Sequence, residues 1–232
     1  MKYSGIEEWK CDRLRSVLRE EFGLTPAKTK TKMIDQIFEA KHTRYSFEKQ
    51  LGDPGKDAVT WQVNMGGKKF ALKQFKPQKS ENKIRKEVEL QTLAANAGIA
   101  PKIHDVDYDR KYIVMDKLDK HLVEVGSDKL VADDSQRQLV NLYNKLDDIG
   151  VFHGDPNPLN YMFKRKKLYV IDFGMSSVID SKLKKKLATE TPNADIMTLS
   201  MVLKLKKIGF PEQSYSILAE SLPTSRKEQF GL

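Results

Sequence analysis

The sequence predicts an α+β protein with two lobes and a helical extension at its N-terminus. Short strand patterns separated by glycine-containing turns fill residues 47 to 75, whereas most of residues 135 to 221 has helical periodicity. Strands that precede helices along a chain are typical of the α+β class. With 232 residues, 39% of them hydrophobic, the chain can bury a substantial core.

The composition indicates a soluble, intracellular protein. Cys11 is the one cysteine, which excludes an intramolecular disulfide. The first residues contain no apolar signal-peptide core, and no stretch approaches the roughly 18 apolar residues of a membrane span. We therefore expect no membrane contact and a location in the cytoplasm or nucleus, or in a host cell or virion if the protein is viral.

The chain is basic, since 41 Lys and Arg against 32 Asp and Glu give a formal charge of +9. This charge favours partners that carry phosphate or acidic groups, such as nucleotides, nucleic acid or acidic proteins. A solvated lysine-rich surface explains the charge equally well, because the basic clusters are short and dispersed over residues 28–32, 164–167 and 182–186.

The first 44 residues are predicted to form two helices. Residues 7 to 21 have Trp9 and Leu14 on one side, and residues 32 to 40 form the second helix after a short basic loop. The helix–extension–helix pattern resembles the SAP-type module, a small fold that often binds DNA, although Lys28 stands where glycine is usual. The resemblance implies contact with nucleic acid, and the alternative is a helical hairpin packed on the main domain.

The remaining elements follow in order along the chain. Strands are predicted over residues 51–63 and 68–75, and the turn at residues 64–67 joins them. A helix over residues 80–97 precedes two short strands. The further elements are strands at 103–106 and 112–115, helices at 135–149, 193–207 and 212–221, and irregular basic chain from 174 to 191.

Polar side chains flank a predicted hairpin formed by residues 161–163 and 168–171. Folding this hairpin sets Asn160, just before its first strand, beside Asp172, just after its second. An amide oxygen and a carboxylate together suit Mg²⁺, which prefers oxygen ligands and accompanies phosphates. Asp155 lies a few residues upstream and is free to meet an attacking hydroxyl. The arrangement indicates phosphoryl transfer, in which catalysis is mostly positioning and charge neutralisation.

The same residues resemble the protein-kinase-like superfamily. His153-Gly154-Asp155 together with Asn160 matches the H-x-D-x4-N catalytic loop, and Asp172-Phe173-Gly174 matches D-F-G. The resemblance implies that Asp155 is the catalytic base or orients the hydroxyl, and that Asn160 and Asp172 bind Mg²⁺. It also implies ATP as the phosphoryl donor.

The resemblance further predicts an upstream lysine, which Phe70-Ala71-Leu72-Lys73 supplies. Strand alternation puts Ala71, which leaves room for adenine, on the same face as Lys73, a cation for the α and β phosphates. Lys73 needs an acidic partner from the following helix. Glu87 lies on the inward face of that helix, and Glu89 is the alternative.

The glycine-rich loop is imperfect. Residues 51 to 59 begin and end as the resemblance requires, but only Gly52 of the three usual glycines is in register, and Gly55 stands in for the others. Pro54 removes one backbone N–H that could bind phosphate. Gly52, Gly55 and Val59 are nevertheless assigned to the nucleotide site.

Three further assignments come from the resemblance. Met115, Asp116 and Leu118 resemble the hinge whose backbone binds the adenine edge. Asp195 resembles the aspartate that anchors the catalytic loop from below, and compensation of the helix dipole is the alternative. His153 is interpreted as a packed structural histidine rather than a general base.

Several departures narrow the type of kinase. Gly154 replaces the arginine that often pairs with an activation-loop phosphate, so we expect activity that does not wait for phosphorylation there. Asn157 replaces the usual lysine, and no Ala-Pro-Glu follows Asp172-Phe173-Gly174. This pared-down chain resembles small atypical kinases: the KEOPS-complex kinase, the RIO group and minimal kinases of large DNA viruses.

The resemblance implies a serine/threonine protein kinase that uses ATP and Mg²⁺, with residues 1–44 as the extension and residues 45–232 as a minimal kinase-like domain. Two alternatives remain open. One is a small-molecule phosphotransferase of the aminoglycoside- or choline-kinase type, and the other is an ATPase or pseudokinase scaffold.

Overall fold

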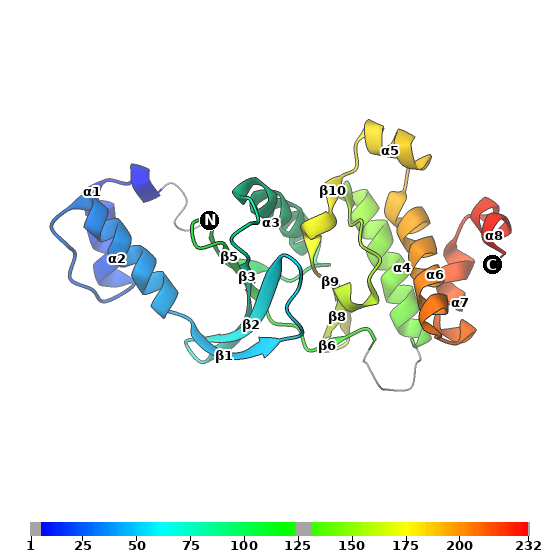
Figure 1. Ribbon diagram of the computed structural model, residues 1–232, viewed down its shortest axis with the longest axis horizontal. Helices are drawn as coiled ribbons and strands as arrows, with labels where there is room; N and C mark the ends of the chain where they lie inside the picture. The colour runs from blue at the N-terminus through cyan, green and yellow to red at the C-terminus, as the bar shows by residue number, and fades with distance from the viewer. Residues whose placement is uncertain (1–5, 124–130, 232) are drawn as a thin grey trace.

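The computed structural model describes residues 6–123 and 131–231, without the side chains of residues 41–43. In this part of the chain an N-terminal helical hairpin is followed by a lobe built on a sheet and then by a helical lobe (Figure 1). The hairpin and the C-terminal helix lie at opposite ends of the long axis (Figure 1). Within the described residues, no helix is both long and apolar enough to span a membrane.

The N-terminal hairpin consists of η1 (Ile6–Glu8), α1 (Cys11–Glu20) and α2 (Lys30–Thr43). The hydroxyl of Thr29 caps α2 by accepting a hydrogen bond from the backbone of Lys32, 3.4 Å away. The two helices enclose a small core drawn entirely from this segment: Ile6, Trp9, Leu14, Val17, Leu18, Met33 and Ile37.

The first lobe is a five-stranded antiparallel sheet in the order β1-β2-β3-β5-β4. Its helix, α3 (Glu81–Asn96), packs on one face of the sheet against a cluster that includes Ala71, Phe75 and Ile84. The strands are β1 (Ser46–Leu51), β2 (Ala58–Met65), β3 (Lys68–Phe75), β4 (Ile103–Asp107) and β5 (Tyr112–Asp116).

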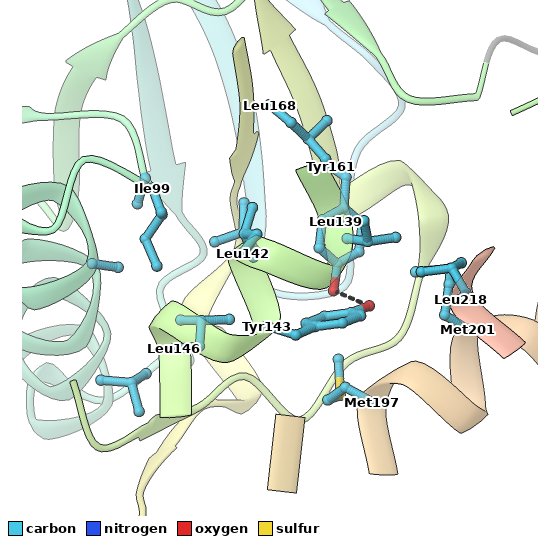
Figure 2. Packing of buried hydrophobic residues seen from close by; sticks show 14 of the residues in the cluster. Ile99, Leu139, Leu142, Tyr143, Leu146, Tyr161, Leu168, Met197, Met201 and Leu218 are labelled. Atoms are coloured by element: carbon cyan, nitrogen blue, oxygen red, sulfur yellow. Dashed lines mark hydrogen bonds between the residues drawn. The ribbon is translucent and has the colours of Figure 1, made fainter. Parts of the chain in front are cut away.

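The second lobe surrounds α4 (Asp133–Asp148), whose apolar side lies in the largest buried cluster of the described chain (Figure 2). Two small sheets lie beside it: β6 (Lys120–His121), β8 (Tyr161–Lys164) and β9 (Lys167–Val170) form one, and β7 (Val151–Phe152) and β10 (Ser177–Val178) form the other. Short 3₁₀ turns, η2 (Pro158–Asn160) and η3 (Phe173–Met175), join these strands. Beyond them come α5 (Ser181–Leu187), the π-helical turn η4 (Asn193–Met197), α6 (Thr198–Ile208), η5 (Glu212–Ser214), α7 (Ser216–Ser221) and α8 (Thr224–Phe230).

The helix α5 corrects the expectation of irregular chain between residues 174 and 191. The carboxylate of Asp180 caps it by accepting a hydrogen bond from the backbone N–H of Leu183 at 2.7 Å. None of the residues of α5 is fully buried, so apolar periodicity gave no indication of this helix.

A buried pair of tyrosines joins α4 to β8. The hydroxyls of Tyr143 and Tyr161 are hydrogen bonded at 2.9 Å, and their rings meet edge to face with centroids 5.8 Å apart (Figure 2). Both side chains are fully buried, so each hydroxyl depends on the other for its hydrogen bond. Since β8 begins directly after Asn160, this pair fixes the start of the strand next to a candidate metal ligand.

Replacing one tyrosine of the pair by phenylalanine leaves the buried hydroxyl of the other without its hydrogen-bond partner. We expect Tyr143→Phe and Tyr161→Phe each to lower the free energy of unfolding by about 1–3 kcal/mol. The double variant should lose less than the sum of the two, because an apolar pair replaces the hydroxyls. Urea unfolding measures all three, with Tyr169→Phe on the neighbouring strand β9 as a control that changes little. Additive losses would show that the hydroxyls do not depend on each other.

Candidate active site

The side chain of Lys73 connects the two lobes. Its ammonium lies 2.6 Å from Oε1 of Glu87 on α3 and 2.8 Å from Oδ1 of Asp172 after β9. The carboxylate of Glu87 is buried, whereas Glu89 is exposed, so the structure selects the partner that the inward face of the helix predicted. Three residues from three elements are thus joined by charge-assisted hydrogen bonds.

The pKa values show how strongly these charges depend on one another. Burial alone would lower the pKa of Lys73, but attraction to Glu87 and Asp172 outweighs it and raises this pKa above its ordinary value of 10.5. Burial alone would raise the pKa of Asp172, but Lys73 and the N–H of Gly174 bring it below its ordinary value of 3.8. Both groups are therefore ionised at neutral pH.

The backbone of Asp172 turns sharply at this point. Its φ of 65° and ψ of 73° lie in the left-handed region, which is costly for a residue with a side chain. The carboxylate offsets part of that cost, since Oδ1 accepts hydrogen bonds from both the backbone of Gly174 and the ammonium of Lys73. The conformation directs the carboxylate of Asp172 back towards β3.

The catalytic-loop residues form a second connected group. The amide nitrogen of Asn160 donates to Oδ2 of Asp155 at 2.8 Å, and the backbone of Asn157 donates to Oδ1 at 3.2 Å. The carbonyl of Asn160 accepts a hydrogen bond from the N–H of Ile171 at 2.8 Å. Asn160 therefore lies beside the chain that enters Asp172, as the hairpin predicted.

Two side-chain oxygen atoms, one from Asn160 and one from Asp172, fit Mg²⁺. Because the amide nitrogen of Asn160 is used by Asp155, its amide oxygen is left for a cation, together with Oδ2 of Asp172. Within the described residues, no cluster of three or more His, Cys, Asp or Glu could hold a metal on its own. Two hard oxygen ligands suit Mg²⁺, which usually completes its octahedral shell with phosphate oxygens and water.

His153 supports the loop from inside. The ring is buried, with Nδ1 3.1 Å from the carbonyl of Asp155 and Nε2 3.0 Å from that of Ile171. Burial lowers the pKa of His153 below its ordinary value of 6.5, although both carbonyl contacts oppose this. The side chain therefore holds the loop and Ile171 together, which agrees with its interpretation as a structural histidine.

The anchor beneath the loop differs from the expected one. Asp195 does not contact the loop; its carboxylate instead pairs with Arg226 of α8, at 2.9 and 3.2 Å. Asn193 takes the anchoring place, since it accepts from the backbone N–H of His153 at 3.0 Å and donates to the carbonyl of Val151 at 2.8 Å. Asn193 and Asp195 are two residues apart in the π-helical turn, so when Asn193 faces the loop Asp195 points to the other side.

Asp147, at the end of α4, fixes Asn193 in turn. One of its oxygens accepts from the backbone and side chain of Asn193 at 2.9 and 2.7 Å, and the other accepts from the N–H of Ala194 at 2.8 Å. Sequence reasoning missed Asp147, because an acidic residue in the last turn of an amphipathic helix normally faces solvent.

The nucleotide-side residues are only partly brought together. Ala71 and Lys73 share a face of β3, as alternation predicted. Val59 pairs with Gln74 and therefore lies on the opposite face, whereas Ala58 pairs with Phe75 and packs in the same cluster as Ala71. The register places Ala58 where the sequence assigned Val59.

The glycine-rich turn between β1 and β2 uses both expected glycines. Gly52 has a φ of +67°, a conformation that favours glycine, and Gly55 donates its N–H to the carbonyl of Ala58 at 2.9 Å. That bond closes the turn but occupies the N–H of Gly55. With Pro54 also lacking an N–H, the turn has two fewer backbone donors to offer a phosphate.

The predicted hinge begins within β5, whose last two residues are Met115 and Asp116. Met115 is buried beside Ala71, its partner across the strands. The carboxylate of Asp116 is taken by His104 at 2.9 Å and Lys164 at 3.3 Å, and its N–H is bonded to a neighbouring strand end. In the described chain the N–H of Leu118 forms no hydrogen bond, which leaves it for a ligand.

Sequence reasoning also missed Lys79. Its ammonium lies 2.5 Å from Oε2 of Glu87, opposite the oxygen used by Lys73. Lys79 lies in the connection just before α3, where no periodicity distinguishes a buried lysine from a solvated one.

Comparison with known proteins places this geometry in a family. The model of the RIO domain matches residues 62–208, more than half of the chain and every element of the site except the glycine-rich turn. The chain belongs to the RIO domain family. The RIO domain here therefore includes Lys73, Glu87, Asp155, Asn160 and Asp172.

Two curated relatives are similar over a shorter stretch. The probable serine/threonine-protein kinase BUD32 homolog of Archaeoglobus fulgidus is 26% identical over 110 residues, 47% of this chain and 53% of that protein. The probable bifunctional tRNA threonylcarbamoyladenosine biosynthesis protein of Methanocaldococcus jannaschii is 32% identical over 118 residues, 48% of this chain and 21% of that protein. The match thus spans about half of the first relative and about a fifth of the second.

A solved structure shows the same fold. The Cydia pomonella granulovirus kinase PK-1 superimposes with a TM-score of 0.51 at 20% identity, over 64% of this chain and 60% of that one. The α+β, kinase-like fold expected from the sequence is therefore confirmed, and the chain is an atypical protein-kinase-like protein.

Gly154 explains why this RIO domain lacks the arginine of many kinases. Its φ is +77°, and a Cβ added there would lie 2.8 Å from the carbonyl oxygen of Met175. The loop carrying Asp155 thus packs directly against the segment after Gly174. A side chain at position 154 would need both a strained backbone and a displaced Met175.

Gly154→Ala should therefore lower the free energy of unfolding by about 2 kcal/mol or more, as strain and the clash combine. Gly67→Ala is a matched control, because Gly67 also has a φ of +77° but has no atom within 4 Å of an added Cβ. Urea unfolding of both variants separates the clash from the strain. Equal losses would contradict the close packing of Met175 on Gly154.

Proposed function

We propose that this RIO domain transfers the γ-phosphoryl group of ATP, with Mg²⁺, to serine or threonine hydroxyls of protein substrates. The observation that supports it most is the convergence of Lys73, Asp155, Asn160 and Asp172, which come from separate elements, at the junction of the two lobes. A core without chemistry would not gather these charges, because buried ionised groups require partners.

Each residue has a role that follows from its contacts. Lys73, held by Glu87, directs a fixed positive charge towards the nucleotide phosphates. Asn160 and Asp172 present oxygens for Mg²⁺, whose charge neutralises the phosphates when it is bound. Ala58, Ala71 and Met115 form the small apolar surface beside which adenine would lie.

Asp155 meets the acceptor hydroxyl. Asn160 and the backbone of Asn157 hold both of its oxygens, so the carboxylate is oriented before a substrate arrives. A hydroxyl placed against it is positioned for attack and can transfer its proton to the carboxylate. Preorganisation of this kind is the main way in which phosphoryl transfer is accelerated.

A protein substrate is favoured over a small molecule. Between Asp172 and α6 the chain forms only η3, β10, α5 and the π-helical turn η4, and α5 has no buried residue. The helices with which small-molecule phosphotransferases build a substrate pocket are not found in this stretch. The name of the Archaeoglobus relative, a probable serine/threonine-protein kinase, points the same way.

Asp155→Asn should reduce phosphoryl transfer by about 10²- to 10⁴-fold, because the amide cannot accept the hydroxyl proton. The assay follows label from ATP onto generic protein substrates with Mg²⁺ present, and ADP in parallel. Asp133→Asn, at the exposed start of α4, is the control and should retain the wild-type rate. If the wild type produces ADP but no phosphoprotein, the result would favour an ATPase. If label instead appears only on small alcohols added in a parallel reaction, it would favour a small-molecule phosphotransferase.

We also propose that residues 1–44 form a separate module that contacts nucleic acid, and that residues 45–232 form the kinase-like domain. The helical hairpin has its own core. Lys28, Lys30 and Lys32 are all exposed around the start of α2. The ammonium of Lys30 donates to the carbonyl of Glu7 at 2.6 Å, and the charges of Lys28 and Lys32 are accessible to phosphates.

Deleting residues 1–44 should abolish a salt-sensitive mobility shift of the full chain with duplex DNA. The matched variant replaces Lys28, Lys30 and Lys32 by glutamine, which keeps the hairpin core intact, and it should weaken the shift strongly. Retention of the shift by either protein, or its absence in the wild type at low salt, would contradict binding through this module.

A further inference from the structure

Lys79 is a second lysine on the carboxylate that holds Lys73. Its side chain is 4% exposed, and its ammonium lies 2.5 Å from Oε2 of Glu87 while Lys73 lies 2.6 Å from Oε1. One buried carboxylate therefore carries a lysine on each oxygen. A lysine is rarely buried to this degree without a specific partner.

The surroundings of the Lys79 ammonium belong to three parts of the site. The ring of Phe75 on β3 lies 4.6 Å away, in the range of a cation–π contact. Asp57, at the end of the glycine-rich turn, has an oxygen at 3.9 Å. A Cβ added to Gly174 would lie 3.5 Å from the ammonium, so the Asp172-Phe173-Gly174 segment passes close by.

Charges alternate along this chain of contacts. Lys79 binds Glu87, Glu87 binds Lys73, and Lys73 binds Asp172. Two positive groups thus face the carboxylates of Glu87 and Asp172, with the half-exposed carboxylate of Asp57 at the edge of the cluster, 3.9 Å from Lys79. Without Lys79, two carboxylates would share Lys73, and the excess negative charge would lie beside the site for nucleotide phosphates.

The position of Lys79 in the chain gives this ion pair a mechanical effect. Lys79 directly precedes Ser80, the N-cap residue of α3, whereas Glu87 lies about two turns further along the helix. The backbone of Lys79 is itself held, since its carbonyl accepts from the ammonium of Lys111 at 3.0 Å. The ion pair therefore braces α3 against a fixed connection. A rotation of α3 about its start would separate Lys79 from Glu87, and a movement away from β3 would separate Lys73 from Glu87.

We propose that Lys79 is a positioning residue: through the second oxygen of Glu87 it holds α3 in place, so that Lys73 stays directed at the nucleotide site before nucleotide binds. This inference deepens the proposed function and rests on it for its catalytic consequence. It also gives a physical basis for activity that does not require phosphorylation after Gly174, since the brace is built from the chain itself.

Lys79→Met tests this, because methionine fills the space of the lysine stem without its charge. In the nucleotide-free full chain, amide hydrogen exchange of residues 81–96 should become at least about tenfold faster. Lys79→Arg should restore most of the protection, and Lys83→Met, at an exposed position of the same helix, should match the wild type. Unchanged exchange in Lys79→Met, or no rescue by arginine, would overturn the proposal.

Catalysis provides a second readout. If Lys79 acts through Glu87, Lys79→Met should lower kcat. If Lys79 instead only binds phosphate, the same substitution should raise the KM for ATP and leave hydrogen exchange in the nucleotide-free protein unchanged. The double variant Lys79→Met/Glu87→Gln should show the same hydrogen exchange in α3 as Glu87→Gln alone. If Lys79→Met by itself does not fold, this comparison tests the proposal in its place. An additive increase in exchange would refute action through Glu87.

The experiments distinguish a failure of the proposed role of Lys79 from a failure of the proposed phosphoryl transfer. The exchange experiment needs neither nucleotide nor turnover, so it decides the role of Lys79 even if the wild type transfers no phosphate. A wild type with a braced α3 and no phosphoryl transfer would contradict the proposed function alone.

Discussion

The ion pairs of Lys73 with Glu87 and Asp172 are the interaction on which the site depends. A buried charge is tolerated only when it is paired, so the ammonium of Lys73 requires both carboxylates to be present. Glu87 comes from α3 and Asp172 from the helical lobe. Because both carboxylates bind Lys73, these ion pairs hold the two lobes together. The sheet, the helix and the turn after β9 each serve to deliver one charge to this point.

The opposite side of the site is organised by hydrogen bonds rather than by ion pairs. Asp147 fixes Asn193, and Asn193 holds the backbone that enters the loop, at Val151 and His153. These hydrogen bonds hold the loop that carries Asp155 in place, although the loop has no regular secondary structure. They also oppose the strain of Asp172, since His153 contacts the carbonyl of the residue just before it. A costly backbone conformation persists because its neighbours hold it from several directions.

Local patterns were enough to predict much of this arrangement. Strand alternation placed Ala71 and Lys73 on one face, the inward side of a helix selected Glu87, and hairpin adjacency joined Asn160 to the chain at Asp172. The misses all depend on non-local geometry. The pairing of β2 with β3 decides whether Ala58 or Val59 faces inward, and the orientation of the π-helical turn directs Asn193 rather than Asp195 at the loop. Lys79 lies in a connection, where burial is set by tertiary packing and leaves no periodic signal.

The imperfect glycine-rich turn and the second buried lysine have a common physical meaning. Pro54 and the closed bond of Gly55 remove two N–H donors from the turn, so part of the phosphate binding of a regular glycine-rich loop is lost. Fixed charge comes from the floor of the site, where Lys73 and Lys79 contact Glu87 and Asp172. Asp172 would hold the cation through Oδ2, the oxygen that Lys73 does not use, while Lys79 neutralises Glu87 through its second oxygen. The charge of Lys73 would then face the phosphates with α3 held where it lies.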